Sequence, residues 1–250
     1  MFKTLRARLK QGYRTAPFPA DAGILPKRYL GRPVINRRDL SRAVQDYHSV
    51  CPSGAIGLVD GEVTLDSGKC IFCGACQNNR VDGAVTFSRD YRMACRKRQD
   101  LIISAGSLAE KASLKSGIKH IFGRSFKLRQ VSAGGCNACE SDINVLNTLS
   151  YDLGRFGIQF TASPRHADGL IVTGPVTNNM KLALEKTYRA MPRPKLVIAV
   201  GACAISGGIY AGHGECNNGV DSIIPVDLYV PGCPPHPLTI LDGLVGIMKG

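Results

Sequence analysis

The sequence of 250 residues lacks the long apolar run of a membrane-spanning helix and the apolar core of a secretion signal. Four of its first ten residues are basic, which is not the composition of a signal peptide. The most apolar window, residues 196–212, is interrupted by glycines and a cysteine, so we expect a buried strand and a loop there. Low-complexity blocks are absent too. These absences favour a globular protein in a reducing compartment, where clustered cysteines bind metals rather than form disulfides.

Acidic residues are scarce only in the first half of the chain. Residues 1–130 carry 24 Lys and Arg against 10 Asp and Glu, whereas residues 131–250 carry 8 against 9, and the net charge is +13. No aromatic pattern interleaves with the basic residues, as binding of single-stranded nucleic acid requires. We therefore expect no nucleic-acid partner.

The basic excess begins in a short segment with the pattern of an amphipathic helix. Phe2, Leu5 and Leu9 fall on one face of residues 1–14, and basic side chains surround them. This pattern predicts contact with an anionic membrane surface, to which each basic residue adds about 1 kcal/mol, or docking on a partner subunit. Residues 15–45 contain four prolines in polar sequence and are expected to form an extended arm.

Ten cysteines are the most informative feature of the composition. Three of them form a C-x2-C-x2-C run, which is typical of bacterial ferredoxins. In those proteins a fourth cysteine follows the run, and another cysteine triplet precedes an upstream Cys-Pro, which is Cys51-Pro52 here. This chain lacks both the fourth cysteine and the other triplet. The two absences remove the ligands of one cluster and leave the ligands of the other complete. We therefore predict one 4Fe–4S cluster on Cys51, Cys70, Cys73 and Cys76. A zinc site, which prefers two separated C-x2-C pairs, is the alternative.

From about residue 127 the sequence alternates apolar strands with helices, which predicts a parallel sheet covered on both faces. The expected strands lie at residues 127–131, 156–160, 169–174, 196–200 and 226–230, and the expected helices at 141–153, 180–191 and 238–248. A connector at residues 100–126, helical around residues 108–114, is expected to precede this sheet.

Three of the expected strands end just before cysteines. Loops at the carboxyl ends of parallel strands lie along one edge of the sheet, so these cysteines are expected to converge. Four thiolates at one point are the ligand set of a second 4Fe–4S cluster, on Cys136, Cys139, Cys203 and Cys233. The neighbouring Gly135, Gly201 and Gly232 would let the backbone approach it closely. A thioredoxin-like dithiol is the alternative for Cys136-x-x-Cys139, but it has no use for the two later cysteines.

Residues 127–250 resemble the small subunit of the membrane-bound, energy-converting nickel–iron hydrogenases, including the formate hydrogenlyase type, and the related 20-kDa (B) subunit of complex I. The motifs that carry the resemblance are residues 135–140 (GCNACE), 163–168 (SPRHAD), 173–177 (TGPVT), 201–203 (GAC), 206–208 (SGG) and 231–235 (PGCPP). The resemblance implies a flavodoxin-like domain and assigns its four cysteines to the proximal cluster. The complex I branch has two adjacent cysteines at the first ligand position, so Cys136-x-x-Cys139 favours the hydrogenase branch.

The front of the chain resembles the ferredoxin-like electron-transfer subunit of the same complexes, with one of its two clusters lost. We therefore expect an α/β protein in four segments. These are a basic helix and arm (1–45), a small α+β ferredoxin-like domain (46–99), the connector (100–126), and the hydrogenase small-subunit-like domain (127–250). Cys95 is interpreted as a bystander thiol, and no role is assigned to Cys216.

The resemblance implies an electron-transfer subunit with two 4Fe–4S clusters, placed peripherally on the cytoplasmic face of the inner membrane. Its expected partners are a hydrogenase-like or complex I-like large subunit and further electron-transfer and membrane subunits. The chain shows no acid–base or nucleophilic constellation of its own, so the catalytic centre is expected on the large subunit. A complex I-like subunit that helps form a quinone site is the first alternative. A zinc- or nucleic-acid-binding protein is the alternative of another class.

Overall fold

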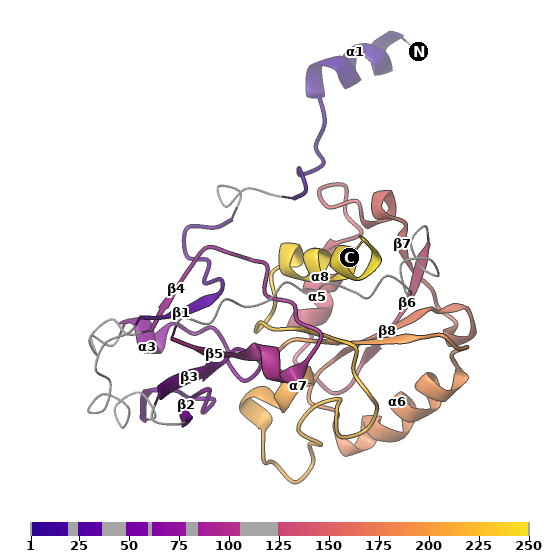
Figure 1. Cartoon of the computed structure of the whole chain (residues 1–250). Coiled ribbons are helices and arrows are strands. Elements are labelled where there is room, and N and C mark those ends of the chain that lie inside the picture. The colour runs from indigo at the N-terminus through magenta and orange to yellow at the C-terminus, as the bar shows by residue number, and fades with distance from the viewer. Residues whose placement is uncertain are drawn as a thin grey trace.

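The structure is a computed structural model that describes residues 2–19, 25–36, 49–59, 62–78, 85–105 and 125–249. Helix α1 (Phe2–Gln11) stands away from the body of the protein (Figure 1), and each of its residues is exposed. Within these described ranges, no helix is long and apolar enough to cross a membrane.

The front part of the chain folds into two small antiparallel sheets. One contains β2 (Ile56–Val59), β3 (Glu62–Asp66) and β5 (Ile102–Ser104), and the other pairs β1 (Pro33–Ile35) with β4 (Val85–Phe87). The short helices α3 (Ala75–Asn78) and η2 (Arg98–Leu101) accompany them. The apolar side chains of these strands share a core with Cys70, so this small core holds one face of the first cysteine set.

The second half of the described chain is built on a five-stranded parallel sheet. Its order is β10 (Leu228–Val230), β9 (Leu196–Val200), β8 (Gly169–Thr173), β6 (Phe126–Ser132) and β7 (Ile158–Phe160). Every residue of β8 and β9 is buried, as their unbroken apolar runs predict for strands covered on both faces.

Helices cover both faces of this sheet (Figure 1). On one face, α5 (Ala138–Val145) and α8 (Pro237–Lys249) pack their apolar residues on the strands. On the other face lie α6 (Asn178–Ala190) and α7 (Ala202–Ser206). Short 3-10 helices occur at Leu153–Phe156, Pro164–His166 and Gly208–Tyr210.

The expected strands and the helices at α6 and α8 are confirmed, with ends that differ by a few residues. The helix expected at residues 141–153 is wrong in extent, because α5 begins at Ala138 and ends at Val145. There the Thr148 hydroxyl donates to the Val145 carbonyl at 2.7 Å. Such a side-chain bond competes with the backbone ladder and favours a turn.

Two strands lie outside the two domains that the sequence predicts. Strand β1 lies in the expected arm, and β5 lies in the expected connector. Each has only three residues, too few for a periodic pattern, and each is fixed by a partner strand from elsewhere in the chain. The helix expected around residues 108–114 lies outside the described residues.

Candidate metal centres

The first cysteine set is brought together from two segments of the front part, the loop with Cys51 and the run from Cys70 to Cys76. Cys51, Cys70, Cys73 and Cys76 line one pocket, together with the strand residues Ile56 and Leu65. Two backbone groups already donate to sulfur: Ala55 N lies 3.2 Å from Cys51 Sγ, and Phe72 N lies 3.3 Å from Cys70 Sγ. Backbone N–H donors of this kind stabilise thiolates and tune cluster potentials.

Burial raises the pKa of two of these thiols, so they are protonated unless a cation binds. For Cys70, burial raises the pKa to about 12, against the opposing hydrogen bond from Phe72 N, and the neighbouring cysteines raise it further. Burial also raises the pKa of Cys76, and Cys51 and Cys73 add to that effect. A bound metal supplies the missing positive charge and deprotonates a coordinating thiol. The donor set, which ranges from the buried Cys70 to the exposed Cys73, therefore suits a metal cluster.

The second cysteine set gathers at the carboxyl edge of the parallel sheet. Cys136 and Cys139 follow β6, with Cys139 in the first turn of α5; Cys203 lies on α7 after β9, and Cys233 follows β10. Burial raises the pKa of Cys139, and the charges of Glu140 and of the other three cysteines add to it. Burial likewise raises the pKa of Cys203 to about 11, with contributions from Cys233 and Cys136. These mutual effects place all four thiols in one neighbourhood.

Glycines bring the backbone against these thiols. A methyl group on Gly201, whose φ is +91°, would lie 2.6 Å from Cys139 Sγ. One on Gly208 would lie 2.9 Å from Cys203 Sγ. By contrast, Gly135 packs on Gly174 and Gly232 on Pro235. Gly201 and Gly208 therefore lie directly against cysteine sulfurs, and the other two glycines shape the loops; the approach of Gly135, Gly201 and Gly232 to a cluster stays a prediction.

The buried carboxylate of Glu140 is a feature of this site that the sequence did not predict. Its side chain is 5% exposed, and Oε1 accepts hydrogen bonds from Ser132 Oγ at 2.5 Å and Thr173 Oγ1 at 2.6 Å. It follows Cys139 directly and lies in the first turn of α5, where a helix N-terminus favours negative charge. The sequence signal was its place in the GCNACE motif.

The remaining two cysteines differ in their surroundings. Cys95 is buried, its Sγ lies 3.4 Å from Met93 O, and burial raises its pKa to about 11. Such a thiol is inert and structural, in keeping with its interpretation as a bystander. Cys216 pairs with Thr177 in an isolated β-bridge and contributes to the raised pKa of Cys203. It therefore lies beside the second set, which its position in the sequence did not predict.

A single zinc ion and a four-iron cluster require different spacings of their sulfur ligands. Among the residues that the structure describes, no three His, Cys, Asp or Glu side chains are close enough to share one metal ion. Four sulfurs around a tetrahedral zinc ion lie about 3.8 Å apart, given Zn–S bonds of about 2.3 Å. A four-iron cluster holds its ligands farther apart, because each thiolate binds a different iron.

Comparison with known proteins agrees with this chemistry. A family described as NADH ubiquinone oxidoreductase, 20 Kd subunit, matches residues 136–247. The probable membrane-bound hydrogenase subunit mbhJ of Pyrococcus furiosus is 47% identical over 123 residues, which are 49% of this chain and 74% of that relative. The chain belongs to the 20-kDa subunit family. Members of this family bind a 4Fe–4S cluster and are subunits of multisubunit hydrogenases and NADH–quinone oxidoreductases, and this chain is such a subunit.

Both branches of the 20-kDa subunit family occur among the relatives. Formate hydrogenlyase subunit 7 of Escherichia coli is 42% identical over 132 residues, or 53% of this chain and 52% of that protein. The NADH-quinone oxidoreductase relative from Desulfovibrio desulfuricans is 41% identical over 115 residues, or 46% of this chain and 62% of that protein. The family match begins at Cys136, so the resemblance of residues 46–99 to a ferredoxin-like subunit stays a prediction.

Proposed function

We propose that the chain relays single electrons through two 4Fe–4S clusters, one bound by Cys51, Cys70, Cys73 and Cys76, the other by Cys136, Cys139, Cys203 and Cys233. The observation that carries the proposal is that each set of four thiols gathers from separate segments of the chain, two for the first set and three for the second. A 4Fe–4S cluster, when bound, supplies a carrier for one electron. The chain itself contributes thiols that range from buried, at Cys70, to exposed, at Cys73, Cys136 and Cys233. It also contributes backbone N–H donors to sulfur and apolar strands beside the first set.

The order of the parallel strands supports a flavodoxin-like identity for the second domain. In chain order the strands stand as 2-1-3-4-5, which is the flavodoxin order. The loop with Cys136 and Cys139 follows the first of them, at the switch point where such sheets bind their ligands. The front part, with its small antiparallel sheets around the first cysteine set, is proposed to be the ferredoxin-like domain at residues 46–99.

We propose that the second cluster faces a large subunit of the nickel–iron hydrogenase type. Formate hydrogenlyase subunit 7 and the membrane-bound hydrogenase subunit are among the relatives, and Cys136-x-x-Cys139 resembles the hydrogenase branch. Further electron-transfer and membrane subunits would complete the assembly. The large subunit would hold the catalytic centre.

A quinone site is the second candidate, because a pocket of about 440 Å³ opens beside Cys233. Tyr29, Tyr151, His236 and Phe72 are among its lining residues. The volume lies within the usual range for small-molecule sites. A short-chain quinone that changes the spectrum of the second cluster in the assembled complex would favour this role, and a spectrum without change would favour the hydrogenase role.

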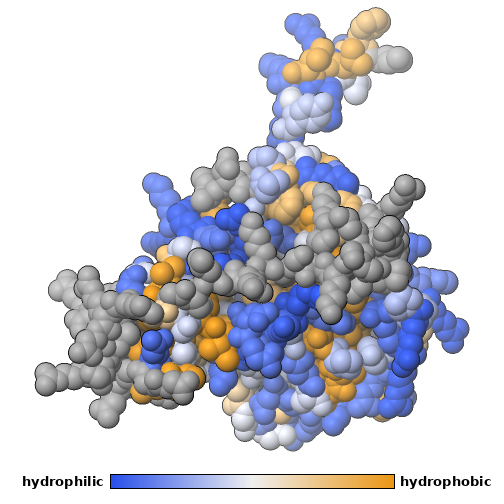
Figure 2. Space-filling model, viewed as in Figure 1, coloured by the Kyte–Doolittle hydropathy of each residue, from blue (hydrophilic) through white to orange (hydrophobic). Residues whose placement is uncertain are grey.

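The N-terminal helix is proposed to bind the anionic cytoplasmic surface of the membrane. Phe2, Leu5 and Leu9 are 90%, 60% and 79% exposed, and basic residues lie beside them (Figure 2). An isolated helix of ten residues is marginal in water, so it needs a surface to cover its apolar face. Anionic lipid matches both its apolar and its basic side chains.

The relay is tested by iron analysis of the full chain purified without oxygen. We expect about eight irons per chain in the wild type and about four in each of two variants, Cys136→Ala and Cys73→Ala. The two variants should lose different electron paramagnetic resonance (EPR) signals, because each removes a ligand of a different cluster. About four irons in the wild type, unaffected by one of the variants, would reject the two-cluster relay. Bound zinc in place of iron would reject any cluster function.

A further inference from the structure

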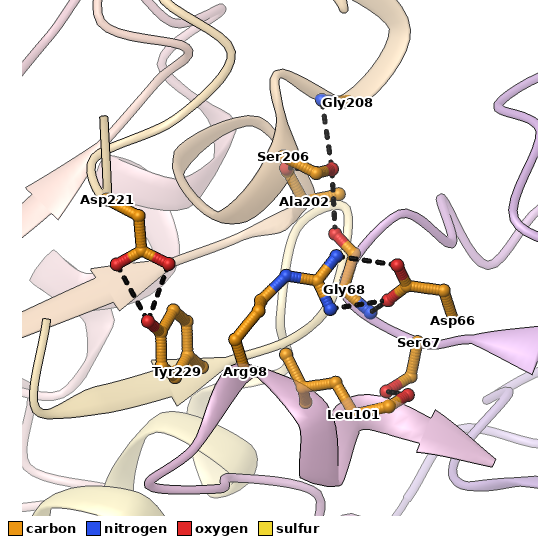
Figure 3. Close-up of polar contacts among 10 residues, drawn as sticks. All are labelled: Asp66, Ser67, Gly68, Arg98, Leu101, Ala202, Ser206, Gly208, Asp221 and Tyr229. Carbon is orange, nitrogen blue, oxygen red and sulfur yellow. Dashed lines mark hydrogen bonds and ion pairs between the residues drawn. The ribbon is translucent and has the colours of Figure 1, made fainter.

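The two cysteine sets lie in different parts of the chain, yet one contact joins their supporting backbone. Ser206 Oγ lies 3.0 Å from Gly68 O, across a sequence separation of 138 residues (Figure 3). Gly68 belongs to the turn after β3, and Ser206 is the last residue of α7. This hydrogen bond therefore links the front part of the chain to the edge of the parallel sheet.

The contact is close because position 68 has no side chain. A methyl group there would lie 2.8 Å from Ile205 Cγ2 and 2.9 Å from Leu101 Cδ1. Ile205 and Leu101 also share the core on the α6–α7 face of the large sheet. The backbone at Gly68 thus packs directly onto that core, and a larger residue would push the turn away from α7.

The turn itself is held by several hydrogen bonds. Arg98 donates from Nη1 and Nη2 to the two carboxylate oxygens of Asp66, at 2.8 and 2.5 Å. Gly68 N donates to Asp66 Oδ1 at 2.9 Å, and the buried Ser67 donates from both N and Oγ to Leu101 O. A bidentate ion pair and a buried hydroxyl give this turn one defined position (Figure 3).

One end of the turn leads directly to the first cysteine set. Cys70 N donates to Asp66 O at 3.0 Å, so the turn fixes the first cysteine of the run. Asp66 N donates to Ala55 O at 2.8 Å, and Ala55 N in turn donates to Cys51 Sγ. Two ligands of the first set are therefore anchored to the same turn.

The other side of the contact leads to the second set. Ser206 closes the short helix α7, which carries Cys203. At the start of this helix, Ala202 N donates to Gly232 O at 2.8 Å, and Gly232 precedes Cys233. Displacement of α7 would therefore move both Cys203, which lies on this helix, and Cys233, whose loop is bonded to it.

A pocket lies between the loop of the first cysteine run and Cys233 of the second set. Its lining includes Phe72, which lies between Cys70 and Cys73, and Cys233 of the second set. One pocket of about 440 Å³ thus touches Cys233 and the loop that carries the first cysteine run.

We infer that the turn at residues 66–68 and Ser206 act together as a spacer that sets the distance between the two clusters. The inference rests on the proposed two-cluster function. One electron passes directly from one cluster to the other within the chain, so that the first is oxidised and the second reduced, and no proton or bond changes. Gly68 and Ser206 are positioning residues, since neither binds a cluster.

The test is the magnetic interaction between the two reduced clusters, measured by EPR on the full chain. This interaction falls steeply with distance, so it reports the spacing even when both clusters are present. The variants are Gly68→Val, whose side chain would separate the turn from α7, and the milder Ser206→Ala. The second removes the hydroxyl that bonds Gly68 O and that also lies 3.1 Å from Ala202 O and 3.5 Å from Gly208 N within its own loop. Their controls are Gly57→Ala, where only Thr64 Oγ1 lies near, at 3.9 Å, and Ser222→Ala, whose hydroxyl bonds to nearby carbonyls of its own loop.

We expect an interaction splitting in the wild type and in both controls, a smaller splitting in Ser206→Ala, and its loss in Gly68→Val. The iron content should stay at about eight in all five proteins. About eight irons with independent signals in the wild type would overturn the spacer and leave the two-cluster function standing. An unchanged splitting in both Gly68→Val and Ser206→Ala would do the same. One cluster per chain would overturn both.

Discussion

Replacement of Glu140 by glutamine should raise the reduction potential of the second cluster. The change removes one negative charge and keeps the shape of the side chain. The carbonyl of the new amide can still accept the hydrogen bonds that Ser132 and Thr173 donate to Oε1. Because the side chain is only 5% exposed, water screens its charge weakly. The reduced cluster carries one more electron, and a nearby carboxylate opposes its arrival.

The size of the shift follows from Coulomb's law. Glu140 follows Cys139 in the chain and its charge raises the pKa of that thiol, so the interaction is worked at a separation on the order of 8 Å. At an effective dielectric constant of about 20, two unit charges at that distance interact by about 2 kcal/mol. For a one-electron couple this corresponds to an upward shift of roughly 90 mV.

The assay is a redox titration monitored by EPR, run on the wild type and on Glu140→Gln at equal iron content. The control is Glu185→Gln on α6, whose carboxylate pairs with the exposed Arg189 at 3.7 Å and is open to solvent screening. We expect the control to titrate within a few tens of millivolts of the wild type. An unchanged or lower potential in Glu140→Gln, with iron intact, would refute the electrostatic reasoning.

Three further predictions concern separate parts of the chain. Gly201→Ala should lose the second cluster and keep the first, because its methyl group would meet Cys139 Sγ at 2.6 Å and its φ is +91°. Iron analysis should show a fall by about half, and full iron content would contradict the packing argument. Burial lowers the pKa of His236 below 6.5, and its Nδ1 accepts a hydrogen bond from Leu238 N, so folding disfavours the protonated ring. The neutral ring therefore stabilises the fold above about pH 6.5, and this stability is lost as the pH falls. The Tm should drop more between pH 7 and pH 5 in the wild type than in His236→Asn. Equal drops of Tm in the two proteins would exclude the effect. The Leu5→Asp variant should bind anionic vesicles roughly tenfold more weakly than the wild type, because the variant no longer buries a leucine side chain in the lipid. Failure of the wild type to bind anionic vesicles in a flotation assay would instead point to a protein partner for α1.

Patterns that are local in sequence predicted most of the parallel sheet. The runs at β8 and β9 are apolar at almost every position, and only a strand covered on both faces buries them fully. The places of Cys203 and Cys233 just after strands predicted their meeting, because parallel strands end at one edge. These inferences need only periodicity and the direction of the strands.

Features that depend on contacts between distant residues were not predictable in this way. Strand β1 has three residues and exists through its pairing with β4. The hydroxyls that satisfy the Glu140 carboxylate come from two different strands, β6 and β8. The contact between Gly68 and Ser206 joins residues 138 positions apart, and neither residue carries a sequence motif that indicates the other. Such contacts follow from the packing of the whole chain rather than from any segment.

The central claim is that this single chain holds two clusters that accept electrons separately. The most direct measurement is a redox titration of the wild-type chain, purified without oxygen and followed by low-temperature EPR. We predict two signals that appear in two one-electron steps, one absent from Cys73→Ala and the other absent from Cys136→Ala. A single signal that titrates in one step, and that survives in either variant, would contradict the account.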